Sequence, residues 1–163
     1  MILKFKEFQK KNLTYKELDD IRIKNFKKFE IKGLPSKKEE HWKYTDLKSI
    51  INSNFENLEI LDDRKSPKYN SKFLIKNFKH NKIILLNGNV IETNFSFENT
   101  KKVNIKSLKD EFKNKNNFKK IKFFFEDDQN SLISLNHALT NDGIILEVKD
   151  DYKFNEPLII YNF

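Results

Sequence analysis

Cysteine is absent from this chain of 163 residues. Without it the chain has no disulfide, no thiolate nucleophile and no cysteine ligand for a metal or cluster. Long apolar runs are absent too. None approaches the eighteen residues of a membrane-spanning helix, and the start, MILKFKEFQKK, lacks the apolar core of a signal peptide. These absences predict a cytoplasmic protein with no membrane partner.

Glycine is scarce, with three in the chain, and arginine occurs only at Arg22 and Arg64. A phosphate-binding loop needs several glycines leading into a helix, whereas Gly88 is a single glycine between two expected strands. The net charge of +8 invites a nucleic-acid interpretation, but few arginines are present to make bidentate contacts with phosphate or guanine. The lysines are interspersed with acids, so we expect a solvated surface. A basic nucleic-acid-binding module is the alternative.

Sixteen phenylalanines, with many isoleucines and leucines, supply core material for one domain or two small units. The first of them are spaced as in a helix. Ile2, Phe5 and Phe8 lie three residues apart, which indicates a short amphipathic helix over residues 2–11.

A second helix is expected to begin at a capping box of Thr14 with Glu17 and to end at Gly33. Its apolar stripe comprises Leu18, Ile21, Phe26 and Phe29. Pro35 follows the glycine and prevents the helix from resuming.

Residues 33–47, GLPSKKEEHWKYTDL, form a corner between helices. Ser36 with Glu39 is a capping box for a short helix, and Thr45 caps a further helix. The apolar face of that further helix comprises Leu47, Ile50, Ile51 and Phe55. Trp42, the only tryptophan, is expected to be a buried packing anchor. A stacking platform for a base or ring is the alternative.

The pattern changes from helical to extended near Lys82. The apolar residues around Asn87-Gly88-Asn89 predict a β-hairpin near 83–91. A short strand is expected at 103–105, followed by a helical turn capped by Ser107. Residues 57–71 and 114–120 are expected to be loops, with a helix within 56–63 as an alternative to the first.

Another helix is expected after Asp127 or Asp128 as its cap, with a glycine stop at Asn141-Asp142-Gly143. One side of this helix comprises Leu132, Leu135, Asn136 and Leu139. Asn136 is expected to be a buried hydrogen-bonding residue that fixes the helix. Strands follow at 144–148 and, after Pro157, at 158–161.

The fold class predicted from these elements is α+β. A mainly helical N-terminal domain is expected over 1–126, with the hairpin inside it. Residues 127–163 are expected to be a helix and the first strands of a larger β domain, because short strands separated by tight turns are how β architectures of repeated coils begin.

Chemistry is harder to find in the sequence. His41, His80 and His137 are far apart, and none has a metal-ligand spacing. His41 lies near Glu39, Glu40 and Asp46, which makes it the one candidate for a proton-transfer cluster, but acids commonly surround a histidine in a charged helix. We therefore expect no enzymatic activity and predict no catalytic, cofactor-binding or metal-ligating residue.

Two blocks resemble a known family. The first is GLPSKKEEHWKYTDL at 33–47, preceded by Arg22 and Phe29. The second is SLISLNHALTNDGIILEV at 131–148, followed by PLII at 157–160. Together they resemble the N-terminal region of the SufB/SufD family of iron-sulfur cluster assembly proteins, and the first block is more similar to the SufD branch than to the SufB branch. Leu132 departs from the pattern, where an aromatic residue is expected on a packing face.

The resemblance implies a scaffold subunit that pairs with SufB and associates with the ATPase SufC. It implies an N-terminal helical region followed by a right-handed parallel β-helix, of which this chain holds only the first strands. It also implies that no cofactor is bound here and that the parent complex handles the iron-sulfur cluster. The matching motif residues, expected to be structural, are Gly33, Leu34, Pro35, Glu39, Trp42, Lys43, Tyr44, Thr45, Leu47, Leu135, Asn136, Gly143 and Pro157.

Overall fold

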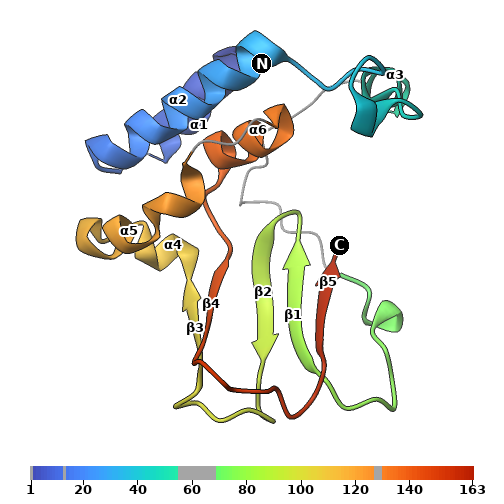
Figure 1. Cartoon of the computed structure of the whole chain (residues 1–163), viewed down its shortest axis with the longest axis vertical. Coiled ribbons are helices and arrows are strands. Elements are labelled where there is room, and N and C mark those ends of the chain that lie inside the picture. Colours follow the sequence, from blue (N-terminus) through green and yellow to red (C-terminus); the bar gives the residue numbers. More distant parts are fainter. Residues whose placement is uncertain (1, 13, 55–68, 127–129) are drawn as a thin grey trace. The chain divides into compact units, whose positions relative to one another are not determined.

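A computed structural model describes residues 2–12, 14–54, 69–126 and 130–163. Helices and strands are both present, which confirms the predicted α+β class. The chain divides into two compact units, each made of two separate stretches (Figure 1). The helical unit comprises Met1–Ile60 and Phe112–Thr140, and the strand unit comprises Leu61–Glu111 and Asn141–Phe163. Within the described residues, no helix is long and apolar enough to cross a membrane.

Helices make up the regular structure described in the helical unit. In chain order they are α1 (Ile2–Lys11), α2 (Lys16–Lys32), the 3-10 helix η1 (Glu40–Trp42), α3 (Leu47–Asn54), α5 (Lys115–Ile121), the 3-10 helix η3 (Lys122–Phe125) and α6 (Ser131–Leu139).

Aromatic side chains from α1 and α2 form the core of this unit against α6. Phe5, Phe8 and Phe26 are each 4% exposed and pack with Ala138. The rings of Phe5 and Phe26 stack with their centroids 3.8 Å apart. The predicted helix over 2–11 is therefore confirmed, and it docks through the phenylalanines whose spacing predicted it.

The start of α2 differs from the prediction, whereas its end agrees. Tyr15 is the N-cap residue and makes no side-chain capping bond. Thr14 lies one residue too early and donates instead to Asp19 Oδ1 at 3.1 Å, so the predicted capping box of Thr14 with Glu17 is wrong. At the other end, the Gly33 N–H donates to the Phe29 carbonyl at 2.7 Å, and Gly33 has a φ of 69°. The predicted glycine stop is confirmed.

The expected loop at 114–120 is wrong, because these residues form α5. Asn114 is the N-cap residue, and its side chain accepts hydrogen bonds from the backbone N–H groups of Asn116 and Asn117. Phe118 and Ile121 are buried on the inner face. A side-chain cap and two buried apolar groups offset the low helix propensity of asparagine.

The cap of α6 is Asn130, whose side chain accepts from the Leu132 N–H at 2.9 Å. Asp127 and Asp128, the predicted caps, lie outside the described residues. The helix ends at Leu139 with Thr140 as its C-cap, so Gly143 does not stop it. Its buried side chains are all small, which permits close packing against α2. They are Ser131, Ser134 and Ala138.

The strand unit holds two small sheets (Figure 1). Its elements are the 3-10 helix η2 (Ser71–Phe73), β1 (Asn81–Leu86), β2 (Asn89–Asn94), β3 (Val103–Ser107), α4 (Leu108–Glu111), β4 (Ile144–Val148) and β5 (Leu158–Asn162). The first sheet has the order β2-β1-β5, and the second pairs β3 with β4 antiparallel. The strands expected at 103–105, 144–148 and 158–161 are therefore all present.

The hairpin predicted near 83–91 is confirmed as β1 and β2. Its two-residue turn is Asn87-Gly88, and both residues have positive φ, 50° and 81°. Asn-Gly tolerates this conformation well, which is why the pair is a strong hairpin signal. A register shift follows Ile84, so Ile91 has no partner opposite it in β1.

The helical turn predicted after the strand at 103–105 is present as α4. Ser107, the last residue of β3, caps it as expected, and its hydroxyl oxygen accepts from the Asp110 N–H at 3.2 Å.

The last strand, β5, pairs parallel with β1. Hydrogen bonds extend this pairing at both ends, from the Asn81 N–H to the Pro157 carbonyl at 2.7 Å and from the Phe163 N–H to the Leu85 carbonyl at 2.9 Å. Continuation into a β-helix stays a prediction. The domain boundary expected at 126/127 also stays a prediction, because packing units and independently folding domains are different properties. The predicted loop at 57–71, with its alternative helix at 56–63, lies largely outside the described residues.

Candidate functional site

The corner at residues 33–47 carries most of the motif residues, and it begins at Gly33. With φ 69° and ψ −162°, Gly33 adopts a conformation that is essentially restricted to glycine. A Cβ there would meet no atom within 4 Å, so the requirement for glycine is conformational and not steric. Leu34 is partly buried and Pro35 is buried just after it. The break in the helix is thus fixed by backbone conformation and then by packing.

The predicted capping box of Ser36 with Glu39 is present in part. Glu39 Oε1 accepts from the Ser36 N–H at 3.1 Å, as a capping box requires. The Ser36 hydroxyl oxygen accepts from the Lys38 N–H at 3.3 Å, one residue earlier than expected. A turn follows, and the expected short helix is present as the 3-10 helix η1, which begins only at Glu40. Glu39 is therefore an architectural residue of the corner.

The aromatic residues of the corner lie closer to the solvent than predicted. Trp42 is only partly buried, so the prediction that it is a core packing anchor is wrong. Tyr44 is 90% exposed, and the Lys43 Nζ lies 5.5 Å from the centroid of its ring. Because η1 and α3 contain no buried residue, this part of the corner rests on turn hydrogen bonds more than on a core.

The helix after the corner is capped by Asp46, one residue later than the predicted Thr45. Asp46 Oδ1 accepts from the Ser49 N–H at 2.9 Å, and its other carboxylate oxygen lies 3.7 Å from Lys37 Nζ. Thr45 instead closes the preceding turn, its N–H donating to the Trp42 carbonyl at 2.9 Å. Leu47, the first residue of α3, is partly buried, and Phe55 lies outside the described residues.

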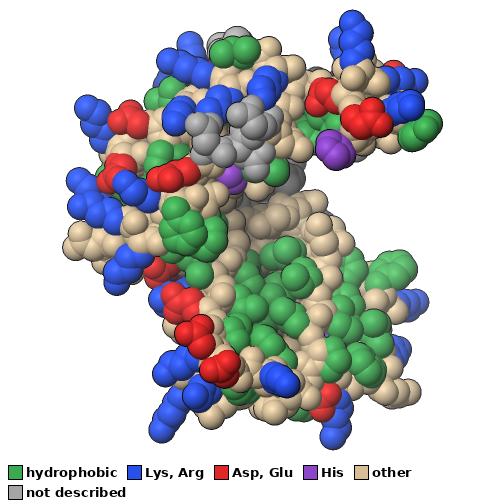
Figure 2. Space-filling view, viewed as in Figure 1, with side chains coloured by type: hydrophobic (Ala, Val, Ile, Leu, Met, Phe, Trp, Pro, Cys, Tyr) green, Lys and Arg blue, Asp and Glu red, His purple; other side chains and the backbone are tan. Residues whose placement is uncertain are grey.

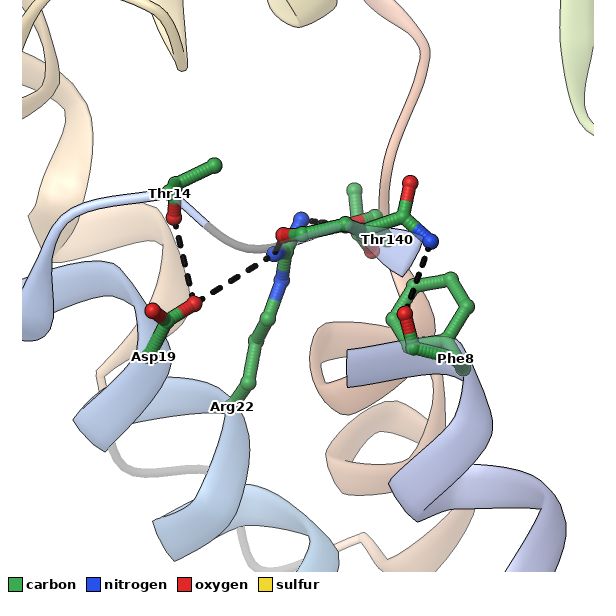
Figure 3. Close-up of polar contacts among 6 residues, drawn as sticks. Phe8, Thr14, Asp19, Arg22 and Thr140 are labelled. Carbon is green, nitrogen blue, oxygen red and sulfur yellow. Dashed lines mark hydrogen bonds and ion pairs between the residues drawn. The ribbon is translucent and has the colours of Figure 1, made fainter. Parts of the chain in front are cut away.

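Arg22 precedes the corner and lies inside the helical unit, with 2% of the residue exposed. Its guanidinium donates to two backbone carbonyls, that of Asn12 at 2.9 Å and that of Thr140 at 2.8 Å. Figure 3 shows Arg22 between Asp19 and Thr140. Asp19 is 3.8 Å away, and the guanidinium lies 5.6 Å from the ring centroids of Phe8 and Phe112. Burial lowers the pKa of Arg22. One side chain therefore ties together α2, the end of α1 and the end of α6.

Two further polar residues of this unit were not predicted, one on the inner face of α2 and one at its N-cap. Asn25, 2% exposed, donates to the carbonyls of Ile21 and Phe125. Tyr15 packs against Phe118 with ring centroids 5.6 Å apart, and burial, followed by the charge of Glu17, raises the pKa of its hydroxyl to about 12. The available signal was position. Arg22 and Asn25 follow Leu18 by four and seven residues, which places them on its face.

The second motif block is divided between the two units. In α6, Leu135 packs against the phenylalanine core, but Asn136 is exposed, so its predicted buried role is wrong. Its backbone carbonyl accepts from the Thr140 hydroxyl at 2.5 Å. Gly143 has a φ of 144°, and a Cβ there would lie 3.3 Å from Leu108 Cδ2. Pro157 directly precedes β5. These residues are not gathered into one site.

A buried carboxylate organises the strand unit instead. Glu98 is 8% exposed and accepts hydrogen bonds from Asn81 Nδ2 and the Tyr152 hydroxyl, both at 2.7 Å. The backbone N–H groups of Asn155 and Glu156 donate to it at 3.1 and 3.2 Å. Burial alone raises the pKa of Glu98, but these hydrogen bonds, that of Tyr152 first, lower it to about 2. Glu98 thus fastens the segment before β5 to the start of β1.

The candidate proton-transfer cluster is not assembled. His41 is exposed, while Glu39 and Asp46 are engaged with the backbone at Ser36 and Ser49. His80 is engaged elsewhere, with Nε2 2.9 Å from the Tyr161 hydroxyl. Among the residues that the structure describes, no three of His, Asp or Glu are grouped so that they could hold a metal ion.

The chain is similar to a known protein family. A family model described as the SufBD protein N-terminal region matches residues 5–160, which takes in nearly the whole chain and every motif residue named above. No curated protein and no solved structure matches the chain.

Proposed function

Because this chain belongs to the SufB/SufD family of iron-sulfur cluster assembly proteins, we propose that it is the N-terminal part of a SufD-like scaffold subunit. The observation that carries the proposal is the family match over residues 5–160, to which the order of the two motif blocks adds support. The SufD assignment, in preference to SufB, rests on the block at 33–47.

The contribution proposed for this region is architectural. Gly33, Glu39 and Asp46 shape the corner through backbone conformation and hydrogen bonds, and Arg22 joins the helices before it. In this proposal the region performs no catalysis and binds no cofactor of its own. The iron-sulfur cluster is cargo of the assembled complex, in which the partners are a SufB-like subunit and a SufC-like ATPase in the cytoplasm.

The test is complementation of two host strains, one lacking SufD and one lacking SufB, by the protein that carries this chain. We expect recovery of iron-sulfur enzyme activity, measured as aconitase activity in extracts, only in the strain that lacks SufD. A tagged copy should also purify together with the SufB-like and SufC-like proteins.

Different outcomes would overturn the SufD assignment and the role in cluster assembly. Recovery only in the strain lacking SufB would overturn the SufD assignment and leave the role in cluster assembly. No recovery in either strain, with neither subunit co-purifying, would overturn the role in cluster assembly itself.

A further inference from the structure

The segment made of α5 and η3 buries one apolar face and exposes another. Phe118, Ile121 and Phe125 point inward and are 0%, 7% and 8% exposed. Phe123 and Phe124 lie on the outer side, 58% and 56% exposed, with their ring centroids 4.1 Å apart. The inner residues pack into the core of the helical unit. Phe123 and Phe124 are not buried by this unit, so they form an exposed apolar surface.

The sequence that leads up to this aromatic pair is rich in lysine. From residue 112 to residue 125 the sequence has five lysines and no acid. Lys115, Lys119 and Lys120 are exposed, whereas Lys122 lies 3.7 Å from Glu17. The acid run that begins at Glu126 bounds the stretch on one side. On the face shown in Figure 2, Lys side chains project from this part of the helical unit.

We propose that this α5–η3 surface, Lys115 to Phe125, docks an acidic protein surface with an apolar recess for Phe123 and Phe124. Protein interfaces place aromatic side chains at the desolvated centre and charged groups at the rim, and complementary rim charges speed association. The inference rests on the proposed function, since the partner is another subunit of the cluster assembly complex.

The composition of the segment favours a protein over a single-stranded nucleic acid. Phe123 and Phe124 lie against each other, which leaves fewer open aromatic faces on which bases could stack. The segment also has no arginine, the side chain best suited to bidentate phosphate contacts.

The experiment measures binding of this protein to the purified SufB-like subunit and, separately, to the purified SufC-like ATPase. We expect Phe123→Ser with Phe124→Ser to weaken binding to one of them by about tenfold or more. Lys119→Glu with Lys120→Glu should weaken the same binding and reduce its dependence on salt between about 50 and about 300 mM. The matched control is Ile31→Ser with Lys27→Glu on α2, because Ile31 is 85% exposed and Lys27 is exposed beside it. It should bind like the wild type.

Far-UV circular dichroism establishes that each variant is folded, as the exposure of the altered residues leads us to expect. If the wild type binds a subunit and the Phe123 and Phe124 variant binds equally well, the inference is wrong while the proposed function stands. A parallel titration with a short oligothymidylate tests whether the surface binds single-stranded nucleic acid instead of a protein. Selective loss of oligonucleotide binding in the variants would assign the surface to nucleic acid. If the wild type binds neither subunit, this inference fails with the interaction on which it rests.

Discussion

Two charged side chains, Arg22 and Glu98, are held inside the protein by hydrogen bonds in place of a close ion pair. Arg22 donates to the carbonyls of Asn12 and Thr140, and Glu98 accepts from neutral side chains and backbone amides. Each joins segments that are distant in sequence. A buried charge is expensive to leave unpaired, so each of these residues should be sensitive to small chemical changes.

For Arg22 the informative change is Arg22→Lys. Lysine keeps the charge but lacks the planar fork that reaches two carbonyls together, so one carbonyl loses its partner. We expect the free energy of unfolding to fall by roughly 1–3 kcal/mol, measured by urea denaturation. Lys24→Ala on the exposed side of α2 is the control and should change little. Equal stability of the lysine variant and the wild type would contradict the role given to the two hydrogen bonds.

For Glu98 the prediction concerns pH. Its pKa is lowered from 4.5 to about 2 in the folded protein, so the stability it contributes is present above pH 4.5 and is lost as the pH falls toward 2. Urea midpoints measured from pH 6 down to pH 2 should therefore fall less steeply for Glu98→Gln than for the wild type. Asp150→Asn, an exposed position in the same unit, should keep the wild-type slope.

At the scale of the elements, local signals predicted what local interactions decide. Gly33 ended α2 and Asn87-Gly88 formed the hairpin turn because these positions require positive φ, which the residue type reveals. The helix α5 was missed because its stability depends on the burial of Phe118 and Ile121, not on propensity. The cap of α2 shifted to Tyr15, which keeps an extended backbone, and the cap of α3 shifted to Asp46, whose carboxylate accepts from the Ser49 N–H.

In the candidate site too, features set by neighbouring residues could be predicted, and features set by distant residues could not. The corner and its capping box could be predicted from spacing, since their partners lie within a few residues. The partial exposure of Trp42 could not be predicted. For Arg22, the spacing from Leu18 indicated the face of the helix on which it lies, but not the carbonyls that bind its guanidinium. The carbonyl of Thr140 that holds Arg22 is supplied by a residue 118 positions away, and no local pattern reports that proximity.

Gly33→Ala tests the backbone conformation that ends α2. The conformation of Gly33 is strained for any residue with a Cβ, although the space around it is open, so we expect a loss of about 1–3 kcal/mol in the free energy of unfolding. Lys38→Ala, exposed in the same corner, is the control. A neutral result for the glycine variant would show that the corner can adopt another backbone path at no cost.

For the whole molecule, each compact unit is built from two stretches, and the chain passes between the units three times. The sequence predicted one boundary, at 126/127, because helical patterns dominate the first part and strands the last. Sequence order indicates which elements are adjacent along the chain, whereas the units are defined by contacts between α2 and α6 and between β1 and β5.

Two fragments of the chain distinguish the predicted boundary at 126/127 from the two units defined by contacts. A fragment of residues 1–126 lacks α6, and with it Ala138 and Leu135 of the phenylalanine core and the carbonyl that binds Arg22. We expect it to lose cooperative unfolding, followed by circular dichroism at about 222 nm in urea. A fragment of residues 1–140 restores these groups and is the control. Cooperative unfolding of the shorter fragment would favour the boundary predicted from sequence.

The interleaving of the two units also affects how the protein is made. During synthesis α1 and α2 leave the ribosome long before α6, and β1 long before β5. The surface of Phe5, Phe8 and Phe26 that α6 covers therefore remains open while more than half of the chain is still being added. Contacts between such distant segments form slowly, and apolar surface left open meanwhile is prone to aggregate. Nascent chains of this protein should therefore be substrates for ribosome-associated chaperones.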